Sequence, residues 1–156
     1  MVRVADLRAA AAGTVLVTVG LGSCVAIALH DAEARVGGLA HVLLPSPALS
    51  RSQDNPGKFP QTALPRLLDL MLELGAVRRR ITARIAGGAS MFGSISPAGA
   101  IQMGERNVVA CREVLERLAI PLLGEAVGGD YGRTVRLDPG TGRLDVSSIR
   151  HGAEQL

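Results

Sequence analysis

Residues 24–45, CVAIALHDAEARVGGLAHVLLP, hold two apolar runs on either side of a short polar turn. The first run, residues 24–30, is almost continuously apolar, as in a strand that is covered on both faces. Residues 31–34 turn the chain, and the second run ends at Pro45, whose nitrogen carries no proton for a sheet hydrogen bond. The stretch therefore predicts an antiparallel pair, residues 24–30 with 36–44, at the centre of the fold.

A further strand is expected just before this pair. Residues 14–19, TVLVTV, alternate and are rich in β-branched side chains. Residues 20–23, GLGS, then form a turn, because glycine tolerates positive φ and lets other groups approach the backbone closely. We expect this turn to place Cys24 at the start of the next strand.

The rest of the chain alternates helices and strands without a linker or an internal repeat. Apolar spacing and turn residues predict helices at 62–74 and 105–118, strands at 80–86 and 121–127, a hairpin of 133–138 with 143–149, and loops at 46–61 and 92–100. At 156 residues the sequence thus predicts one mixed α/β (α+β) domain over residues 1–156, with a largely antiparallel β core flanked by two main helices.

Composition argues against binding to nucleic acid. The net charge is only +3, and the one basic cluster is Arg78-Arg79-Arg80. The aromatic residues are Phe59, Phe92 and Tyr131, too few to stack on successive bases. All three fall in expected loops, where each either packs a loop onto the core or lines a shallow groove for a protein substrate.

Both cysteines are expected to be reduced thiols. Cys24 and Cys111 could form one disulfide, but a chain of this length and apolar content does not need a covalent staple. Cys111 lies on the apolar face of the second predicted helix, which indicates inert packing. The repeated close spacing of zinc ligands is missing, so we expect no metal and no cofactor.

Residues 21–24, LGSC, also resemble the end of a bacterial lipoprotein signal, and residues 9–29 carry no formal charge over a length that could cross a membrane. Glycines and β-branched residues in this segment favour strands over a helix. Asp6 lies where a signal should be purely positive, and an apolar run follows Cys24 where a polar tether would be expected. We therefore expect neither lipidation nor membrane insertion.

Cys24 and His41 are the best candidates for a reacting pair. A thiol needs a nearby group that favours its ionised form, and an imidazolium can supply this. His151 lies in a polar tail, and His30 is about 20 Å from Cys24 along one strand. His41 lies on the antiparallel neighbour, nearly opposite Cys24, where side chains approach to about 5 Å.

A Cys-His pair also needs an orienting group and a site for the developing negative charge. Thr18 is the hydroxyl best placed beside His41 if the glycine turn folds its strand back. The backbone N–H groups around Gly22 and Ser23 could bind an oxyanion. The alternatives are that Cys24 is ordinary strand packing and His41 a satisfied core histidine.

Several motifs resemble the CheD family, the chemoreceptor glutamine deamidases of bacterial and archaeal chemotaxis. The matching stretches cover nearly the whole chain: VTVGLGSCVA at 17–26, GGLAHVLLP at 37–45, PGKF at 56–59, AGGASMF at 86–92, GERN at 104–107 and GG at 128–129. The resemblance implies a cytoplasmic cysteine amidohydrolase that converts receptor glutamines to glutamates. It also implies a fold similar to the catalytic domains of toxin deamidases.

The same resemblance implies Cys24 as the nucleophile, His41 as the acid and base, and Thr18 as the orienting residue. We add Gly22, Ser23, Gly87, Gly88 and Phe92 as candidate substrate or oxyanion contacts. The implied partners are the cytoplasmic helices of chemoreceptors and, in some organisms, the phosphatase CheC; the alternative is a non-catalytic regulator that binds either of them. One departure stands out: residues 59–61 read FPQ where the family tends to have Tyr-Ala-Asp.

Overall fold

The two apolar runs of residues 24–45 form the antiparallel pair that the sequence predicts. In the computed structural model, which describes residues 1–91 and 102–156, these runs are β3 (Val25–Asp31) and β4 (Val36–Val42). Their register runs from Val25 opposite Val42 to Asp31 opposite Val36. Every residue of both strands is buried, as expected for strands in the middle of a layered fold.

These two strands lie at the centre of a five-stranded sheet. Its order is β1-β4-β3-β5-β6, with β1 at Leu7–Ala11, β5 at Thr82–Gly87 and β6 at Leu122–Val127. Among the described strands, β5 and β6 form the one parallel pair. The largely antiparallel core is therefore confirmed, but β1 was not predicted.

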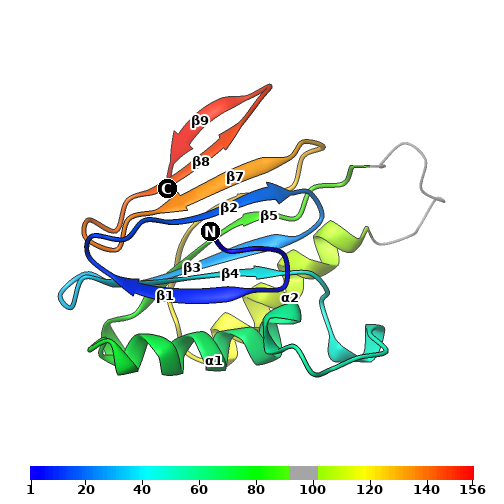
Figure 1. Cartoon of the computed structure of the whole chain (residues 1–156). Helices are drawn as coiled ribbons and strands as arrows, with labels where there is room; N and C mark the ends of the chain where they lie inside the picture. Colours follow the sequence, from blue (N-terminus) through cyan, green and yellow to red (C-terminus); the bar gives the residue numbers. More distant parts are fainter. Residues whose placement is uncertain (92–101) are drawn as a thin grey trace.

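The predicted strand at 14–19 and the C-terminal hairpin form a second sheet, which the sequence did not indicate. The order is β2-β7-β8-β9, with β2 at Leu16–Leu21, β7 at Arg133–Leu137, β8 at Leu144–Ser148 and β9 at Gly152–Gln155. β2 begins two residues later than predicted and continues through Gly20, which has a positive φ of 72° beside a register shift. This sheet lies over the first one in Figure 1.

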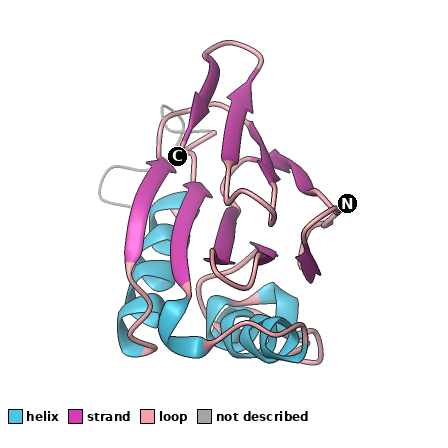
Figure 2. Ribbon diagram, turned by 90° about the vertical axis from the view of Figure 1, so that its left-hand side faces the viewer, coloured by secondary structure: helices cyan, strands magenta, loops and turns pink. Residues whose placement is uncertain are grey.

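Two α-helices cover the other face of the five-stranded sheet. They are α1 (Pro60–Glu73) and α2 (Met103–Arg117), and Figure 2 shows the helices at the bottom and lower left of the molecule. α1 begins two residues earlier than predicted because Pro60 fits the first helical position. Short 3₁₀ turns occupy Pro47–Leu49, Pro56–Lys58 and Arg78–Arg80, the last where a strand start was predicted.

Alternate residues of β3 and β4 face two different apolar cores. Val25, Ile27 and Leu29 pack toward the helices, in one cluster with residues of α1 and α2. Cys24, Ala26 and Ala28 pack toward the second sheet, with residues of β2, β7 and β8. The layers are therefore helices, five-stranded sheet and four-stranded sheet, and Cys24 faces the interface between the two sheets.

The segment at residues 9–29 forms strands and turns instead of a membrane helix. Within the part of the chain that the structure describes, no helix is both long and apolar enough to span a bilayer.

Candidate active site

The turn at residues 22–24 carries the chain from one sheet to the other. β2 ends at Leu21 in the four-stranded sheet, and β3 begins at Val25 in the five-stranded sheet. Both flanking residues are fully buried, so the ends of the turn are fixed. Cys24 is thus the last residue of the crossover, and not the first residue of the strand as predicted.

The carbonyl groups of this turn are all held by the protein. Gly22 O accepts from the N–H of Ala89 at 2.8 Å, and Cys24 O accepts from the N–H of Gly88 at 2.8 Å. Ser23 O accepts from Nδ2 of Asn107 at 2.9 Å. Within residues 1–91 and 102–156, the N–H groups of Ser23 and Cys24 donate to no other residue. The turn is thus anchored through its oxygens and keeps N–H groups for another acceptor.

His41 is held by a buried chain of hydrogen bonds. Its Nδ1 lies 2.7 Å from Oγ1 of Thr18, and the same oxygen lies 2.7 Å from the carbonyl oxygen of Val2. A hydroxyl has one proton to donate, and the Val2 carbonyl can only accept. Thr18 therefore donates to Val2 and accepts from Nδ1–H of His41, which leaves Nε2 of the neutral ring as a base.

Nε2 of His41 has no hydrogen-bond partner among the described residues, although it is buried. His41 pairs with Ala26 in the register of β3 and β4, and Cys24 comes two residues before Ala26 on the same face. Diagonal neighbours of this kind are about 7–8 Å apart, which is within reach of aromatic and long side chains. Of the sequence-predicted residues, Thr18 and His41 are thus in direct contact, and Cys24 lies on the same face of the sheet.

Burial favours the neutral forms of both His41 and Cys24. Desolvation lowers the pKa of His41 from 6.5 to about 4. Desolvation also raises the pKa of Cys24 above its ordinary value, although the residue's own N–H acts in the opposite direction. A thiolate beside an imidazolium, as the sequence suggested, is thus disfavoured in the free protein. The arrangement suits a neutral base that takes the thiol proton as the sulfur attacks.

Gly87 and Gly88 support the turn from β5. A Cβ atom on Gly87 would lie 2.3 Å from the carbonyl oxygen of Cys24, and one on Gly88 would lie 2.3 Å from Cγ2 of Val108. Both glycines have positive φ, 113° and 64°. The N–H of Gly88 is already donated to Cys24, so these residues position the turn and Gly88 has no N–H left for an oxyanion. Phe92, the other predicted contact, lies outside the described residues.

A cavity of about 770 Å³ lies beside the turn, over the second sheet. Gly20, Met91, Tyr131 and Arg133 are among its lining residues, and Met91 also lies against Gly22, where a Cβ atom would be 3.3 Å from its Cγ. Cys24 does not line the cavity, and 8% of its surface is exposed. Met91 therefore connects the cavity to the turn that precedes Cys24, and Cys24 itself is buried.

The remaining predicted residues have structural contacts. Phe59 is fully buried, so the packing interpretation of this aromatic is confirmed, whereas Tyr131 lines the cavity. His30 is bonded through Nε2 to Pro139 O at 2.8 Å, and His151 stacks on Tyr131. Cys111 is fully buried, and burial raises its pKa, in agreement with packing.

The departure at residues 59–61 also affects structural positions. Phe59 is the N-cap of α1 and Pro60 is its first residue. Gln61 donates from Nε2 to the carbonyl oxygen of Pro45 at 2.7 Å. All three residues therefore fix the start of α1.

Sequence reasoning missed Asn107 and Val2. Asn107 lies at helical spacing with Cys111 and Val114, so a polar residue on an otherwise apolar face was a readable signal. Val2 takes part through its carbonyl oxygen, which no side-chain pattern could have indicated.

Comparison with known proteins identifies close relatives. Residues 43–148 match the family model described as CheD, chemotactic sensory transduction. The chain is 44% identical over 155 residues to a protein of Desulfitobacterium hafniense named "Probable chemoreceptor glutamine deamidase CheD", covering 99% of this chain and 96% of the relative. It is 40% identical over 156 residues to "Chemoreceptor glutamine deamidase CheD" of Halalkalibacterium halodurans, again with 99% and 96% coverage.

Proposed function

The chain belongs to the CheD family, and from this premise we propose that it deamidates glutamine side chains of chemoreceptors with Cys24 as the nucleophile. The observation that carries the proposal is the chain from Val2 O through Thr18 to His41, because it leaves Nε2 as a buried base on the face that holds Cys24. A core histidine kept only for packing would have both ring nitrogens bonded.

The first half of the reaction forms a thioester. Nε2 of His41 takes the proton from the Cys24 thiol while the sulfur attacks the carboxamide carbon of glutamine. The carbonyl oxygen becomes negative in the tetrahedral intermediate. The C–N bond then breaks, and the amine leaves as ammonia with the proton from Nε2.

The second half uses water. Nε2 removes a proton from a water molecule, which attacks the thioester carbon, and the C–S bond breaks as the sulfur recovers that proton. The product is a glutamate side chain, and the thiol is regenerated. Throughout the reaction, Thr18 accepts a hydrogen bond from Nδ1–H of His41. This bond directs the other ring nitrogen, the basic Nε2, away from Thr18.

The N–H groups of Ser23 and Cys24 are our candidates for the oxyanion site. The carbonyl groups in the same peptide planes, those of Gly22 and Ser23, accept from Ala89 and Asn107, so these planes are held before substrate arrives. Donors fixed in advance stabilise a developing charge without a cost for reorganisation.

The substrate segment enters by the cavity beside Met91 and Tyr131. Its lining combines apolar and basic side chains, with Arg133 lying over the Tyr131 ring at 4.3 Å. We place the reaction in the cytoplasm, on the cytoplasmic helices of the receptor, and extend the proposal to a complex with CheC. These three points rest on family membership.

The test is mass spectrometry of a purified chemoreceptor fragment incubated with the wild-type protein, Cys24→Ala or Cys111→Ala. We expect the mass change of glutamine deamidation, with release of ammonia, for wild type and Cys111→Ala, and none for Cys24→Ala. Conversion by Cys24→Ala would overturn the role of the sulfur. Binding of the fragment without any conversion by wild type would make the protein a regulator instead of an enzyme.

Thr18→Val provides a graded version of the same test. The substitution keeps the size of the side chain but removes the oxygen that accepts from Nδ1 of His41. We expect kcat on the receptor fragment to fall about 10–100-fold, because the ring then populates the wrong tautomer. An unchanged kcat would show that the orientation of His41 does not depend on Thr18.

A further inference from the structure

Asn107 lies in the second turn of α2 and is fully buried. Its Nδ2 donates two hydrogen bonds, to the carbonyl oxygen of Ser23 at 2.9 Å and to that of Leu43 at 3.1 Å. Both acceptors are carbonyl oxygens, so the orientation of the amide is fixed: only the NH₂ group can face them.

These two carbonyl groups belong to the two halves of the candidate active site. Ser23 immediately precedes Cys24 in the crossover, and Leu43 comes two residues after His41. The ladder between β3 and β4 ends at the pair Val25 and Val42. Beyond that pair, the described residues of the two segments have no direct ladder hydrogen bond, and the side-chain amide of Asn107 bonds both. It thereby joins the segment that carries Cys24 to the segment that carries His41.

The other contacts of this region do not make the same connection. The N–H groups of Gly88 and Ala89 hold Cys24 and Gly22 to the end of β5, and Leu43 N–H donates to Lys58 O at 3.0 Å. Each of those bonds fixes one of the two segments to a third part of the fold. Among the described side chains, only that of Asn107 bonds both.

The amide is also poorly explained as a stabilising core residue. Its Oδ1 is buried and has no hydrogen-bond partner among the described residues. A buried acceptor without a partner lowers stability, and its neighbours on this helix face, Val108 and Cys111, are apolar. The feature that an apolar side chain could not supply here is the pair of N–H donors.

We propose that Asn107 is a positioning residue that sets the distance and angle between the Cys24 sulfur and the His41 imidazole. The inference deepens the proposed function and rests on it for its catalytic consequence. The side chain touches no substrate, because it is fully buried beneath the turn. Its loss should therefore lower kcat and leave KM unchanged.

The test compares Asn107→Asp and Asn107→Leu with Asp31→Asn as a matched control. Aspartate keeps the shape of asparagine but presents oxygens to two carbonyl groups, and leucine keeps the branching without any donor. Asp31 is equally buried but lies at the other end of β3, so its substitution reports on lost stability alone.

The first readout is the rate of Cys24 alkylation by iodoacetamide between pH 5 and pH 9, which does not require a receptor. Digestion and mass spectrometry separate Cys24 from the buried Cys111, and circular dichroism checks the fold. The second readout is kcat and KM on the receptor fragment. We expect at least a tenfold fall in kcat and an altered pH profile of alkylation for both Asn107 variants, and wild-type values of both for Asp31→Asn at a temperature where it is folded.

A wild-type alkylation profile and kcat in either folded Asn107 variant would overturn the inference. Failure of both variants to fold would also overturn it, since Asn107 would then be required for the fold and not for spacing. The two proposals can also be separated. If the pH profile of Cys24 alkylation differs between wild type and the Asn107 variants, but wild type never deamidates the fragment, the proposed function fails while the positioning of Cys24 stands.

Discussion

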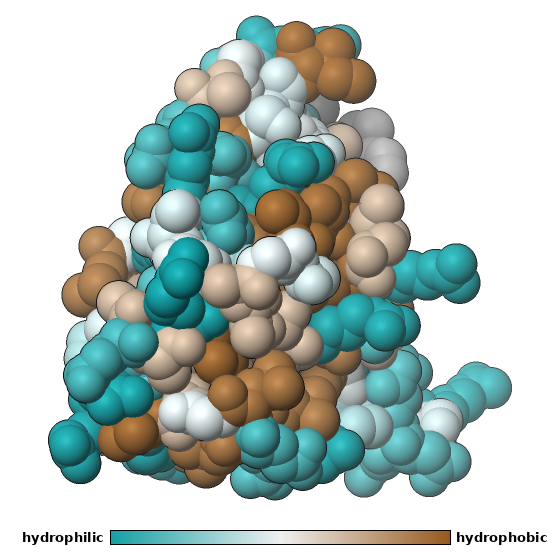
Figure 3. All heavy atoms as spheres, turned by 60° about the vertical axis from the view of Figure 1, so that its left-hand side comes forward, coloured by the Kyte–Doolittle hydropathy of each residue, from teal (hydrophilic) through white to brown (hydrophobic). Residues whose placement is uncertain are grey.

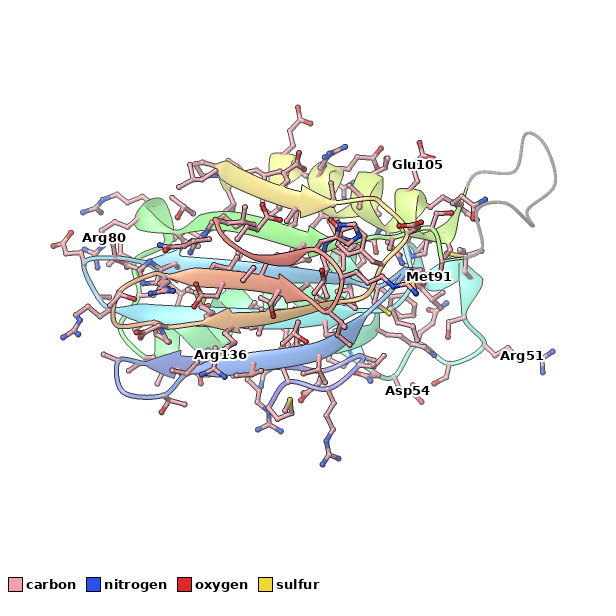
Figure 4. The ribbon with its side chains drawn as sticks, turned by 90° about the horizontal axis from the view of Figure 1, so that it is seen from above. Arg51, Asp54, Arg80, Met91, Glu105 and Arg136 are labelled. Carbon is pink, nitrogen blue, oxygen red and sulfur yellow. The ribbon has the colours of Figure 1, made fainter. Side chains whose placement is uncertain are left out.

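The two ends of the β3–β4 pair treat buried polar groups in opposite ways. At the end of β3, the carboxylate of Asp31 accepts from the N–H groups of Glu33, Ala34 and Val77 and from Nε of Arg80, all at 2.8–3.1 Å. At the other end, His41 Nε2 and Asn107 Oδ1 are buried without a partner among the described residues. Figure 4 places Arg80 and Met91 at these opposite ends.

The difference separates a structural end of the strand pair from the end that carries the candidate active site. Asp31 has its oxygens fully used, which is how a buried charge is stabilised. Figure 3 shows the face at the left of Figure 1, where the β3–β4 turn lies, with hydrophilic side chains between apolar patches. At the Cys24 end, by contrast, Nε2 of His41 has no partner among the described residues, which costs stability.

The pKa values show the same contrast. Burial alone would raise the pKa of Asp31, but hydrogen bonds from Arg80, Val77 and Ala34 outweigh it and lower the pKa to about 2. The pKa of His41 falls to about 4 through burial, and no described residue bonds its Nε2 to compensate. One end therefore holds a charge, and the other excludes it.

The largest effect is expected from His41→Gln, which keeps a polar side chain of similar length but removes the acid–base nitrogen. We expect kcat on a receptor fragment to fall about 10²–10⁴-fold. The free energy of unfolding at pH 7 should change by less than about 2 kcal/mol. Ammonia release and urea unfolding measure the two quantities. A variant that loses stability and activity in proportion would contradict the division between the ends.

The second effect is expected from Asp31→Asn, which should lower stability and leave activity unchanged. The substitution removes the charge that Arg80 pairs with at 3.0 Å and replaces one acceptor oxygen by a donor facing N–H groups. Because Arg80 is partly exposed and can be solvated, we expect a loss of about 2–3 kcal/mol in urea unfolding. Its kcat at 25 °C should remain that of wild type. A lower kcat in the folded variant would show that the two ends are coupled.

The third effect concerns acid unfolding, in which His41 and Asp31 are expected to lose their contributions to stability over two different pH ranges. A group with a lowered pKa binds its proton more readily when unfolded, so its contribution to stability is lost as pH falls. For His41 this loss runs from pH 6.5 to about 4, and for Asp31 from 3.8 to about 2. At about 1.4 kcal/mol per pKa unit, the loss amounts at most to about 3–4 kcal/mol for His41 and about 2–3 kcal/mol for Asp31.

Urea unfolding at successive pH values measures both windows. His41→Gln should lack the upper one and Asp31→Asn the lower one. If His41→Gln still loses stability between pH 6.5 and 4 as wild type does, the histidine is not buried in its neutral form.

Local patterns were enough to predict the central strands, both helices and the contact between Thr18 and His41. The second sheet was not predictable in the same way. A glycine turn at 20–23 is compatible with strands in one sheet or in two, and only packing of Leu16 and Leu21 against β7 residues decides between them. β1 was missed because its sequence, LRAAA, has little β preference.

The protonation states of the candidate site residues were harder to predict than the identity of those residues. An imidazolium beside Cys24 was a reasonable expectation from spacing, but it ignored that His41 is fully enclosed. The protonated nitrogen of His41 depends on the carbonyl oxygen of Val2, which is remote in sequence from both Thr18 and His41. Asn107 was missed because its helix was read for apolar spacing alone.

Thr18 comes from the four-stranded sheet, His41 from the five-stranded sheet, and Cys24 from the crossover that joins them. No single layer contains all three residues. A shift of one sheet over the other would separate them while every strand stayed intact, so the proposed mechanism makes turnover depend on how the two sheets pack.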